Sequence, residues 1–177
     1  MGLETNRLRL EEYKMKDLDD FFRLKSCDEV WRYERFCPIR KRAQAEELFR
    51  GILKSMCDGE LTCHGVFLKE SAEFIGEAGI LEYDAKNNRG VVCCNLLPEY
   101  WGNGYGTEIT AEILRYAFLL LHIERIEALV LEENVGAIRV LNKNGFVLEG
   151  TLRNYYKYDS GYQNVCYYSM LASDYRR

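Results

Sequence analysis

The chain has 177 residues, of which 47% are hydrophobic and 13% aromatic, and its formal net charge is −4. This length suits a single domain over residues 1–177, and the composition excludes wholesale disorder. The acidic balance does not favour a nucleic-acid partner, which requires a strongly basic face. Because no apolar run approaches the ~18 residues that cross a bilayer and no secretory signal is recognisable, we expect a cytoplasmic protein with no membrane partner.

The cysteines do not match a metal site. There are seven of them, without a CxxC pair, and the only histidines are His64 and His122. Zinc sites in proteins combine closely spaced Cys and His ligands, so we expect no bound metal. Most of the thiols are expected to be buried as small apolar groups, in a reducing compartment.

The first half of the chain predicts a strand, two helices and a meander. Alternation predicts a strand at Arg7–Leu10, and Asp17 then opens a short helix carrying Leu18, Phe21, Phe22 and Leu24. Helical spacing of Leu48, Ile52, Leu53 and Met56 predicts an amphipathic helix over Lys41–Asp58. The three segments that follow read as antiparallel strands: Thr62–Leu68, Phe74–Tyr83 and Gly90–Leu97.

The second half predicts two helices and three strands. A helix over Thr107–Leu121 has one apolar face, formed by Ile109, Ile113, Tyr116, Ala117 and Leu120. A buried strand is expected at Ile126–Leu131, and a helix at Asn134–Asn144 with Ile138 and Leu141 inward. The closing hairpin comprises Phe146–Tyr158, a turn at Asp159, Ser160 and Gly161, and Tyr162–Leu171. This order predicts an α+β domain with one mixed sheet.

A glycine-rich turn is the main chemical signal. The run WGNGYGTE spans Trp101–Glu108, between a predicted strand and a predicted helix. Gly102, Gly104 and Gly106 can adopt positive φ, so that successive N–H groups converge on an anion at the helix N-terminus. It is not a P-loop, since no Lys-Ser/Thr pair follows, nor a dinucleotide fingerprint, since no repeated βαβ pattern surrounds it. Glycines that merely shape a tight turn are the alternative.

Two separated motifs carry a family resemblance. The run LPEYWGNGYGTE, followed later by EENVGAIRVLNKNGFVLEGTLRNYYKYDSGYQNV, resembles the GNAT superfamily of N-acetyltransferases, and within it the RimJ/RimL-like ribosomal-protein N-terminal acetyltransferases. The resemblance covers essentially the whole chain, including the opening LRL strand. It implies the acyl-CoA N-acyltransferase fold, with a mixed, mostly antiparallel sheet that is splayed at the CoA site and has helices on both faces. It also implies acetyl-CoA as the cosubstrate.

The resemblance also implies a set of CoA-binding residues. The GNAT turn (R/Q)xxGx(G/A) falls on Trp101–Gly106, and its backbone amides would hold the CoA pyrophosphate. Backbone groups near Leu96 and Leu97 would pair with the pantetheine arm. Asn134 begins the second motif and would contact pantetheine, although Asn also favours a plain helix N-cap. The implied residues are Leu96, Leu97, Trp101, Gly102, Asn103, Gly104, Tyr105, Gly106, Thr107, Asn134 and Ala137.

The chain departs from the family at its catalytic positions. Ala137 stands where relatives often carry a serine, Leu141 where other branches carry a tyrosine acid, and Tyr156 where some RimL-like enzymes carry a carboxylate. Candidate bases are Glu77 and Glu82, whose predicted strand places them on opposite faces, so at most one faces the cleft. A solvated or paired carboxylate is the alternative fate of either. Tyr156 remains a further catalytic candidate.

The sequence therefore predicts acetyl transfer to a primary amine. At pH 7, deprotonating an α-amine costs about 1 to 1.4 kcal/mol, against about 4.6 kcal/mol for a lysine-like amine, so weak acid–base equipment favours the N-terminus of a protein or peptide. One alternative is an acetyltransferase acting on a small molecule, such as a polyamine, an amino acid or an antibiotic. Another is a CoA-binding sensor or interaction module without activity. A monomer or homodimer is expected.

Overall fold

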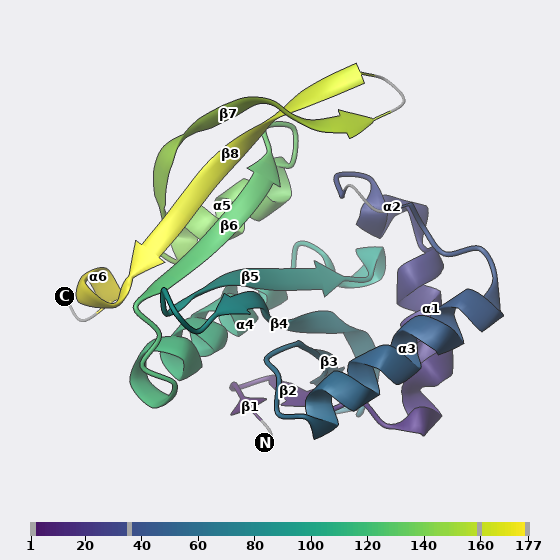
Figure 1. The fold of residues 1–177 in the computed structure, drawn as a ribbon. Helices are drawn as coiled ribbons and strands as arrows, with labels where there is room; N and C mark the ends of the chain where they lie inside the picture. Colours follow the sequence, from purple (N-terminus) through teal and green to yellow (C-terminus); the bar gives the residue numbers. More distant parts are fainter. Residues whose placement is uncertain (1–2, 35–36, 159–160, 176–177) are drawn as a thin grey trace.

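The computed structural model describes residues 3–34, 37–158 and 161–175. These residues form one eight-stranded sheet in the order β1-β2-β3-β4-β5-β6-β8-β7, in which only the β5–β6 pair is parallel (Figure 1). The predicted α+β class and mixed, mostly antiparallel sheet are confirmed. The strands are β1 (Leu3–Glu4), β2 (Leu8–Glu11), β3 (Cys63–Leu68), β4 (Phe74–Asp84), β5 (Arg89–Leu96), β6 (Arg125–Leu131), β7 (Val147–Tyr158) and β8 (Gly161–Leu171).

Helices cover both faces of the sheet. The group α1–α3 lies on one side, and α4 and α5 lie on the other (Figure 1). None of the helices in the described part of the chain is long and apolar enough to cross a membrane. The helices are α1 (Leu18–Ser26), α2 (Asp28–Trp31), α3 (Arg42–Cys57), α4 (Tyr105–Arg115), α5 (Val135–Lys143) and α6 (Ala172–Tyr175).

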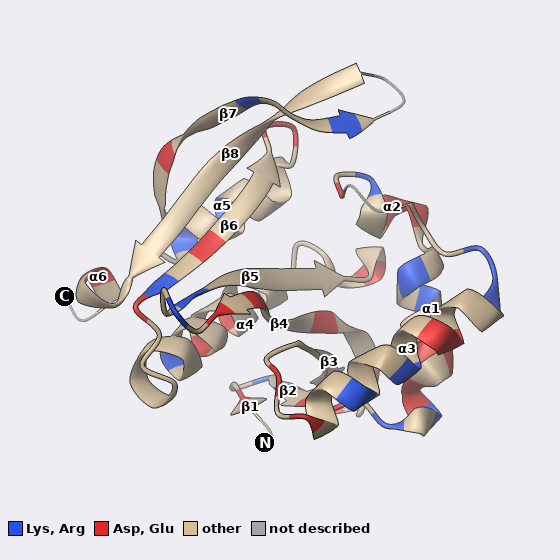
Figure 2. Ribbon diagram, viewed as in Figure 1, with Lys and Arg blue, Asp and Glu red and all other residues tan. Residues whose placement is uncertain are grey.

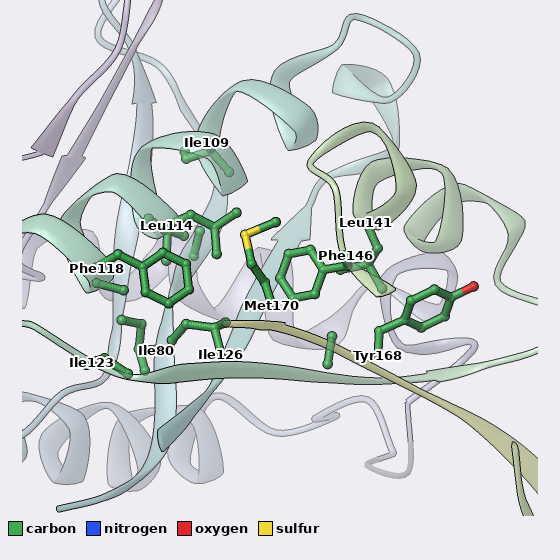
Figure 3. Close-up of a cluster of buried hydrophobic side chains, with 14 of the residues drawn as sticks. Ile80, Ile109, Leu114, Phe118, Ile123, Ile126, Leu141, Phe146, Tyr168 and Met170 are labelled. Carbon is green, nitrogen blue, oxygen red and sulfur yellow. The ribbon is translucent and has the colours of Figure 1, made fainter. Parts of the chain in front are cut away.

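The larger core lies between the sheet and α4. Figure 3 shows Ile109 and Leu114 of α4 above Ile80 and Ile126 of the sheet. A fully buried side chain of this size contributes about 1.5–3 kcal/mol. A second core packs α1 and α3 against the opposite face through four rings, those of Tyr13, Phe21, Phe49 and Phe74.

Two predicted helix faces are wrong in part. The residues Tyr116–Leu120 form a π-helical turn after α4, and this turn leaves Leu120 47% exposed while Ala117 and Phe118 are buried. A π turn contains one residue more than an α turn, which shifts every later side chain around the helix. On α3 the buried residues are Ala45 and Phe49, whereas Leu48 is 45% exposed.

The remaining expectations agree in order and differ at boundaries. Helix α4 begins at Tyr105, two residues before the predicted start, and β1, α2 and α6 have no counterpart in the sequence prediction. The predicted turn residues Asp159 and Ser160 lie outside the described residues. All seven cysteines are free thiols; five are buried or partly buried, and Cys37 and Cys57 are exposed.

A charged network joins β5, β6 and β7 at the start of β6 (Figure 2). Arg89 on β5 donates to Glu127 on β6 at 3.0 Å, and Arg125 donates to Glu127 at 2.7 Å. Arg125 also makes two bonds of 2.8 and 2.7 Å to Glu149 on β7, which accepts a third from Ser169. The Arg125 guanidinium and the Ser169 hydroxyl together lower the pKa of Glu149 from 4.5 to about 2.

This depressed pKa predicts a pH-dependent contribution to stability. The stabilisation by Glu149 is complete above its unfolded pKa near 4.5 and disappears as the pH falls toward about 2. Because the Glu149 side chain is 40% exposed, we expect Glu149→Gln to lower the free energy of unfolding by only about 1 kcal/mol at pH 7. At pH 3 the difference should be less than roughly half of that, as measured by urea denaturation.

The control is Glu46→Gln, which breaks an exposed pair with Arg50 on α3 and should cost less than about 0.5 kcal/mol. Equal differences for Glu149→Gln at both pH values would contradict the prediction.

Candidate active site

The parallel strands β5 and β6 separate partway along their length. Their register pairs are Arg89 with Arg125, Gly90 with Ile126, and Val91 with Glu127. Beyond these three pairs β5 continues to Leu96 beside β4, whereas β6 continues to Leu131 beside β8. The two strands diverge visibly in Figure 1. We call the opening between them the β5–β6 split.

Main-chain groups of β5 are directed into the split. The Leu97 N–H donates to the Ile75 carbonyl at 2.9 Å, which makes the facing residues Gly76 and Leu96 a non-hydrogen-bonded pair of the antiparallel ladder. In such a pair both residues turn their own N–H and C=O away from the partner strand. By the same alternation Cys94 and Leu96 direct these groups toward β6. An extended ligand can therefore pair with this edge as a strand would.

Leu96 and Leu97, both predicted to contact pantetheine, differ in whether their main-chain groups face the split. The Leu96 carbonyl faces the split and accepts the indole N–H of Trp101 at 2.7 Å. Leu97 uses its N–H on Ile75, and its carbonyl accepts from Tyr100 at 3.0 Å. The geometry therefore retains Leu96 as a candidate contact and does not favour Leu97. The Trp101 indole ties the glycine-rich turn to the end of β5.

The glycine-rich turn leads directly into α4. Gly102 and Gly104 have φ of 78° and 81°, the left-handed region that only glycine occupies at little cost, and Gly104 is the N-cap of α4. The N–H groups of the first helical turn have no acceptor within the helix, and the helix dipole adds positive potential. Tyr105, Gly106 and Thr107 carry these donors. The arrangement suits a diphosphate.

Asn134 is the N-cap of α5. This is the structural role that the sequence offered beside a contact with pantetheine. The Asn134 carboxamide oxygen accepts the Ala137 N–H at 3.1 Å. The amide NH₂ is thus the group that remains for a ligand. Ala137, partly buried beside it, brings a methyl group where a serine would bring a hydroxyl.

Glu77 on β4 is buried within a polar cluster. It is 2% exposed, and its carboxylate accepts from Lys25 of α1 at 2.5 Å, from Asn95 of β5 at 3.2 Å and from Tyr13 at 3.3 Å. Asn95 is the register partner of Glu77 and directly precedes Leu96. Glu77 therefore lies one strand away from the split, on the side covered by α1.

Lys25 is a site residue that sequence analysis missed. Its ammonium lies 4.4 Å from the Trp31 ring centre and 5.1 Å from that of Phe21, in addition to its bond with Glu77. Burial alone would lower the pKa of Lys25, but the Glu77 carboxylate outweighs burial and leaves that pKa raised. The available signal was a lysine at helical spacing from Leu18 and Phe21, where an apolar residue is expected.

The other two catalytic candidates lie elsewhere. Glu82 is exposed at a φ of 50°, in the irregular part of the β4–β5 ladder, at the end where β5 and β6 are still paired. Tyr156 is partly buried near the tip of β7, opposite Gln163 of β8, and its ring contacts that of Tyr155. Of the two candidate carboxylates, Glu77 is thus the nearer to the open end of β5. Leu141 is 5% exposed and packs beside Phe146 in the core (Figure 3).

One group of potential metal ligands occurs among the described residues. Ligand atoms of Cys63, Glu77 and Cys93 lie within 4.8 Å of one another. The bond with Cys93, followed by burial, raises the pKa of the Cys63 thiol well above its usual range, so that the thiol stays neutral. Because the Glu77 carboxylate is already paired with Lys25, this group does not fit a divalent cation.

A pocket of about 240 Å³ lies at the end of β6, where the loop to α5 meets the β7–β8 hairpin. Two carboxylates, from Glu132 and Glu133, lie on its rim beside Asn134. The other lining residues are Leu131, Asn154, Tyr162, Gln163 and Asn164. This polar lining suits a cationic group.

Comparison with known proteins identifies the family. A family model described as an acetyltransferase (GNAT) domain matches residues 7–147. An uncharacterised N-acetyltransferase, p20, of Bacillus licheniformis is 31% identical over 173 residues, which are 98% of this chain and 97% of that protein.

Solved structures share the fold at lower identity. A spermidine N-acetyltransferase from Vibrio cholerae, in complex with CoA and spermine, superposes with a TM-score of 0.86 at 24% identity, covering 96% of this chain and 98% of the other. A provisionally named ribosomal-protein-serine acetyltransferase from Vibrio cholerae gives 0.80 at 18% identity, covering 97% of each chain. The family match, together with the split sheet and the glycine-rich turn, shows that this chain belongs to the GNAT family of acetyl-CoA-dependent N-acetyltransferases.

Proposed function

We propose that this acetyltransferase acts on the N-terminal α-amine of a protein or peptide, with residues 1–177 as one catalytic domain. The carrying observation is that Glu77, the nearer of the two candidate bases to the split, is already paired with Lys25. Its carboxylate already accepts from Lys25, Asn95 and Tyr13, and positions 137 and 141 carry no hydroxyl, so the site has little acid–base equipment. Such a site suits an acceptor that is partly neutral at pH 7, as an α-amine with a pKa of about 7.7–8.0 is.

Acetyl-CoA supplies the activated acetyl group when it is bound. The N–H groups of Tyr105, Gly106 and Thr107 bind its diphosphate, and the glycines allow close approach of the backbone. The main-chain groups of Cys94 and Leu96 bind and orient the extended arm along β5, and the Asn134 amide contacts it from the opposite wall. Orientation of this kind contributes more to the rate than acid–base groups do, which explains activity without Ser at 137 or Tyr at 141.

Glu77 receives the proton of the amine through water. Its carboxylate accepts from Lys25, and Asn95 links it to the strand that lines the split. Tyr156, at the hairpin tip, lines the acceptor side. A polyamine is the second candidate acceptor, because the pocket rimmed by Glu132 and Glu133 lies beside Asn134 and suits a second ammonium group. The spermidine N-acetyltransferase similarity supports the same alternative.

Acceptor preference is tested with three substrates at pH 7. The first is a peptide whose free N-terminus is its only amine, the second is an N-terminally acetylated peptide whose only amine is a lysine side chain, and the third is spermidine. We expect kcat/KM for the free N-terminus to exceed that for the other two by at least about tenfold, since its deprotonation costs about 3 kcal/mol less. CoA release is followed with a thiol reagent. Preference for spermidine would contradict the proposal and favour the polyamine alternative.

Coenzyme binding is tested by Gly104→Ala. A Cβ at φ 81° costs about 1–2 kcal/mol and distorts the turn, so we expect the acetyl-CoA Kd from calorimetry to rise at least about tenfold. Gly59→Ala is the matched control, because Gly59 has φ 77° and open space around it and lies just after α3. An unchanged Kd for Gly104→Ala, or an equal rise for Gly59→Ala, would contradict a role for this turn.

The role of Glu77 is tested in a background that leaves no buried charge unpaired. Removing Glu77 alone would strand Lys25 and destabilise the fold by about 3–5 kcal/mol, so the variant is Lys25→Met with Glu77→Gln. We expect acetyl-CoA binding to persist while kcat falls by about 10²- to 10⁴-fold. Thermal unfolding and the acetyl-CoA Kd of the double variant serve as the control, because Lys25→Met alone would leave the buried Glu77 carboxylate unpaired. Full turnover by the double variant would exclude Glu77 as the base.

A further inference from the structure

Glu108 places a negative charge beside the candidate phosphate site. It lies in the first turn of α4, and its N–H donates to the carbonyl of the N-cap residue Gly104 at 3.1 Å. Its side chain is 19% exposed. A carboxylate there is favourable for the helix dipole, but it repels an anion that approaches the same N–H groups. A site for a diphosphate therefore requires that this charge be compensated.

The β1–β2 segment supplies the compensation. The Glu108 carboxylate accepts from the Thr5 hydroxyl at 2.5 Å, from the Arg7 N–H at 3.0 Å, from Arg7 Nε at 2.7 Å, and pairs with Arg7 Nη2 at 2.6 Å. Burial alone would raise the pKa of Glu108, but the bonds from Thr5 and Arg7 outweigh burial and leave it lowered. The carboxylate is thus ionised, fully bonded and neutralised by one guanidinium.

The same guanidinium contacts the glycine-rich turn. Arg7 Nη1 donates to the Asn103 carbonyl at 3.1 Å, and the guanidinium lies 4.5 Å from the centre of the Tyr105 ring. A Cβ on Gly104 would lie 3.6 Å from Arg7 Nη2. Arg7 thus contacts the residues on both sides of Gly104, and its side chain remains 49% exposed.

Trp101 brings no charge to this turn. Its indole N–H is bonded to the Leu96 carbonyl. The cation that reaches the turn comes instead from Arg7, 94 residues earlier in the chain.

We propose that Arg7 is a positioning residue for coenzyme binding: by neutralising Glu108 and holding the Asn103 carbonyl, it keeps the first turn of α4 receptive to the CoA diphosphate. This inference rests on the proposed function, because it presupposes that the turn binds CoA. It adds a specific electrostatic requirement, which a merely structural ion pair would not impose. Loss of Arg7 exposes an uncompensated carboxylate to the ligand, whereas loss of Glu108 does not.

The test measures CoA affinity by calorimetry for the wild type, Arg7→Met, Glu108→Gln and the double variant. We expect Arg7→Met to raise the Kd at least about tenfold at 50 mM salt and by less at 500 mM, because salt screens the repulsion. Glu108→Gln should bind within about threefold of the wild type, and the double variant should recover to the same range, since neither retains the carboxylate. Thermal unfolding confirms that each variant is folded.

Three results would overturn the inference: an unchanged Kd for Arg7→Met, a double variant as weak as Arg7→Met, or a tenfold weaker Glu108→Gln. The affinity of Glu108→Gln can be measured even if the Arg7→Met variant does not fold. Thr5→Val is the matched control, because it removes one bond from Glu108 and keeps Arg7; its Kd should stay within about threefold. A wild type that fails to bind CoA would overturn the proposed function itself, and the inference with it.

Discussion

Strand β5 is held on one side by β4 at seven of its eight residues and on the other side by β6 at only three. That asymmetry is the constraint from which the candidate site follows. Beyond Val91 the ladder hydrogen bonds that a central strand normally makes are replaced by main-chain groups directed into an opening. The opening persists because each wall is rigid separately: β6 pairs with β8 through all seven of its residues. The charged network around Arg125 joins the walls where they meet.

Charge compensation is the second feature common to the site. Two of the carboxylates near the predicted ligand positions are paired with cations from the first 25 residues of the chain: Glu77 with Lys25, and Glu108 with Arg7. A buried or half-buried carboxylate without a partner is costly, so removing either cation alone would destabilise the fold. In the proposed function the Glu108 pair also matters for binding, since an anionic coenzyme requires that a nearby carboxylate be neutralised. The N-terminal segment thus contributes to the site without supplying the phosphate-binding turn.

Local patterns predicted most of the elements, the glycine-rich turn before α4 and the Asn134 N-cap of α5. The glycines before α4 and Asn134 before α5 carry strong local signals, because φ preference and capping depend on a few neighbouring residues. Helix faces were less predictable: one π turn moved Leu120 to the surface, and Phe49 rather than Leu48 packs under α3. The partners Lys25 and Arg7 were missed because their ion pairs span 52 and 101 residues, a separation that periodicity does not encode.

Residue-resolved hydrogen exchange with and without CoA tests the central claim most directly. The account predicts that CoA slows exchange of the amides of Cys94 and Leu96 and of Tyr105–Thr107. The amides of Cys93 and Asn95, which the ladder directs to β4, should be unaffected. Protection confined to other parts of the chain, or equal protection of alternate residues along β5, would contradict an arm that binds in the split and a diphosphate that binds at the turn.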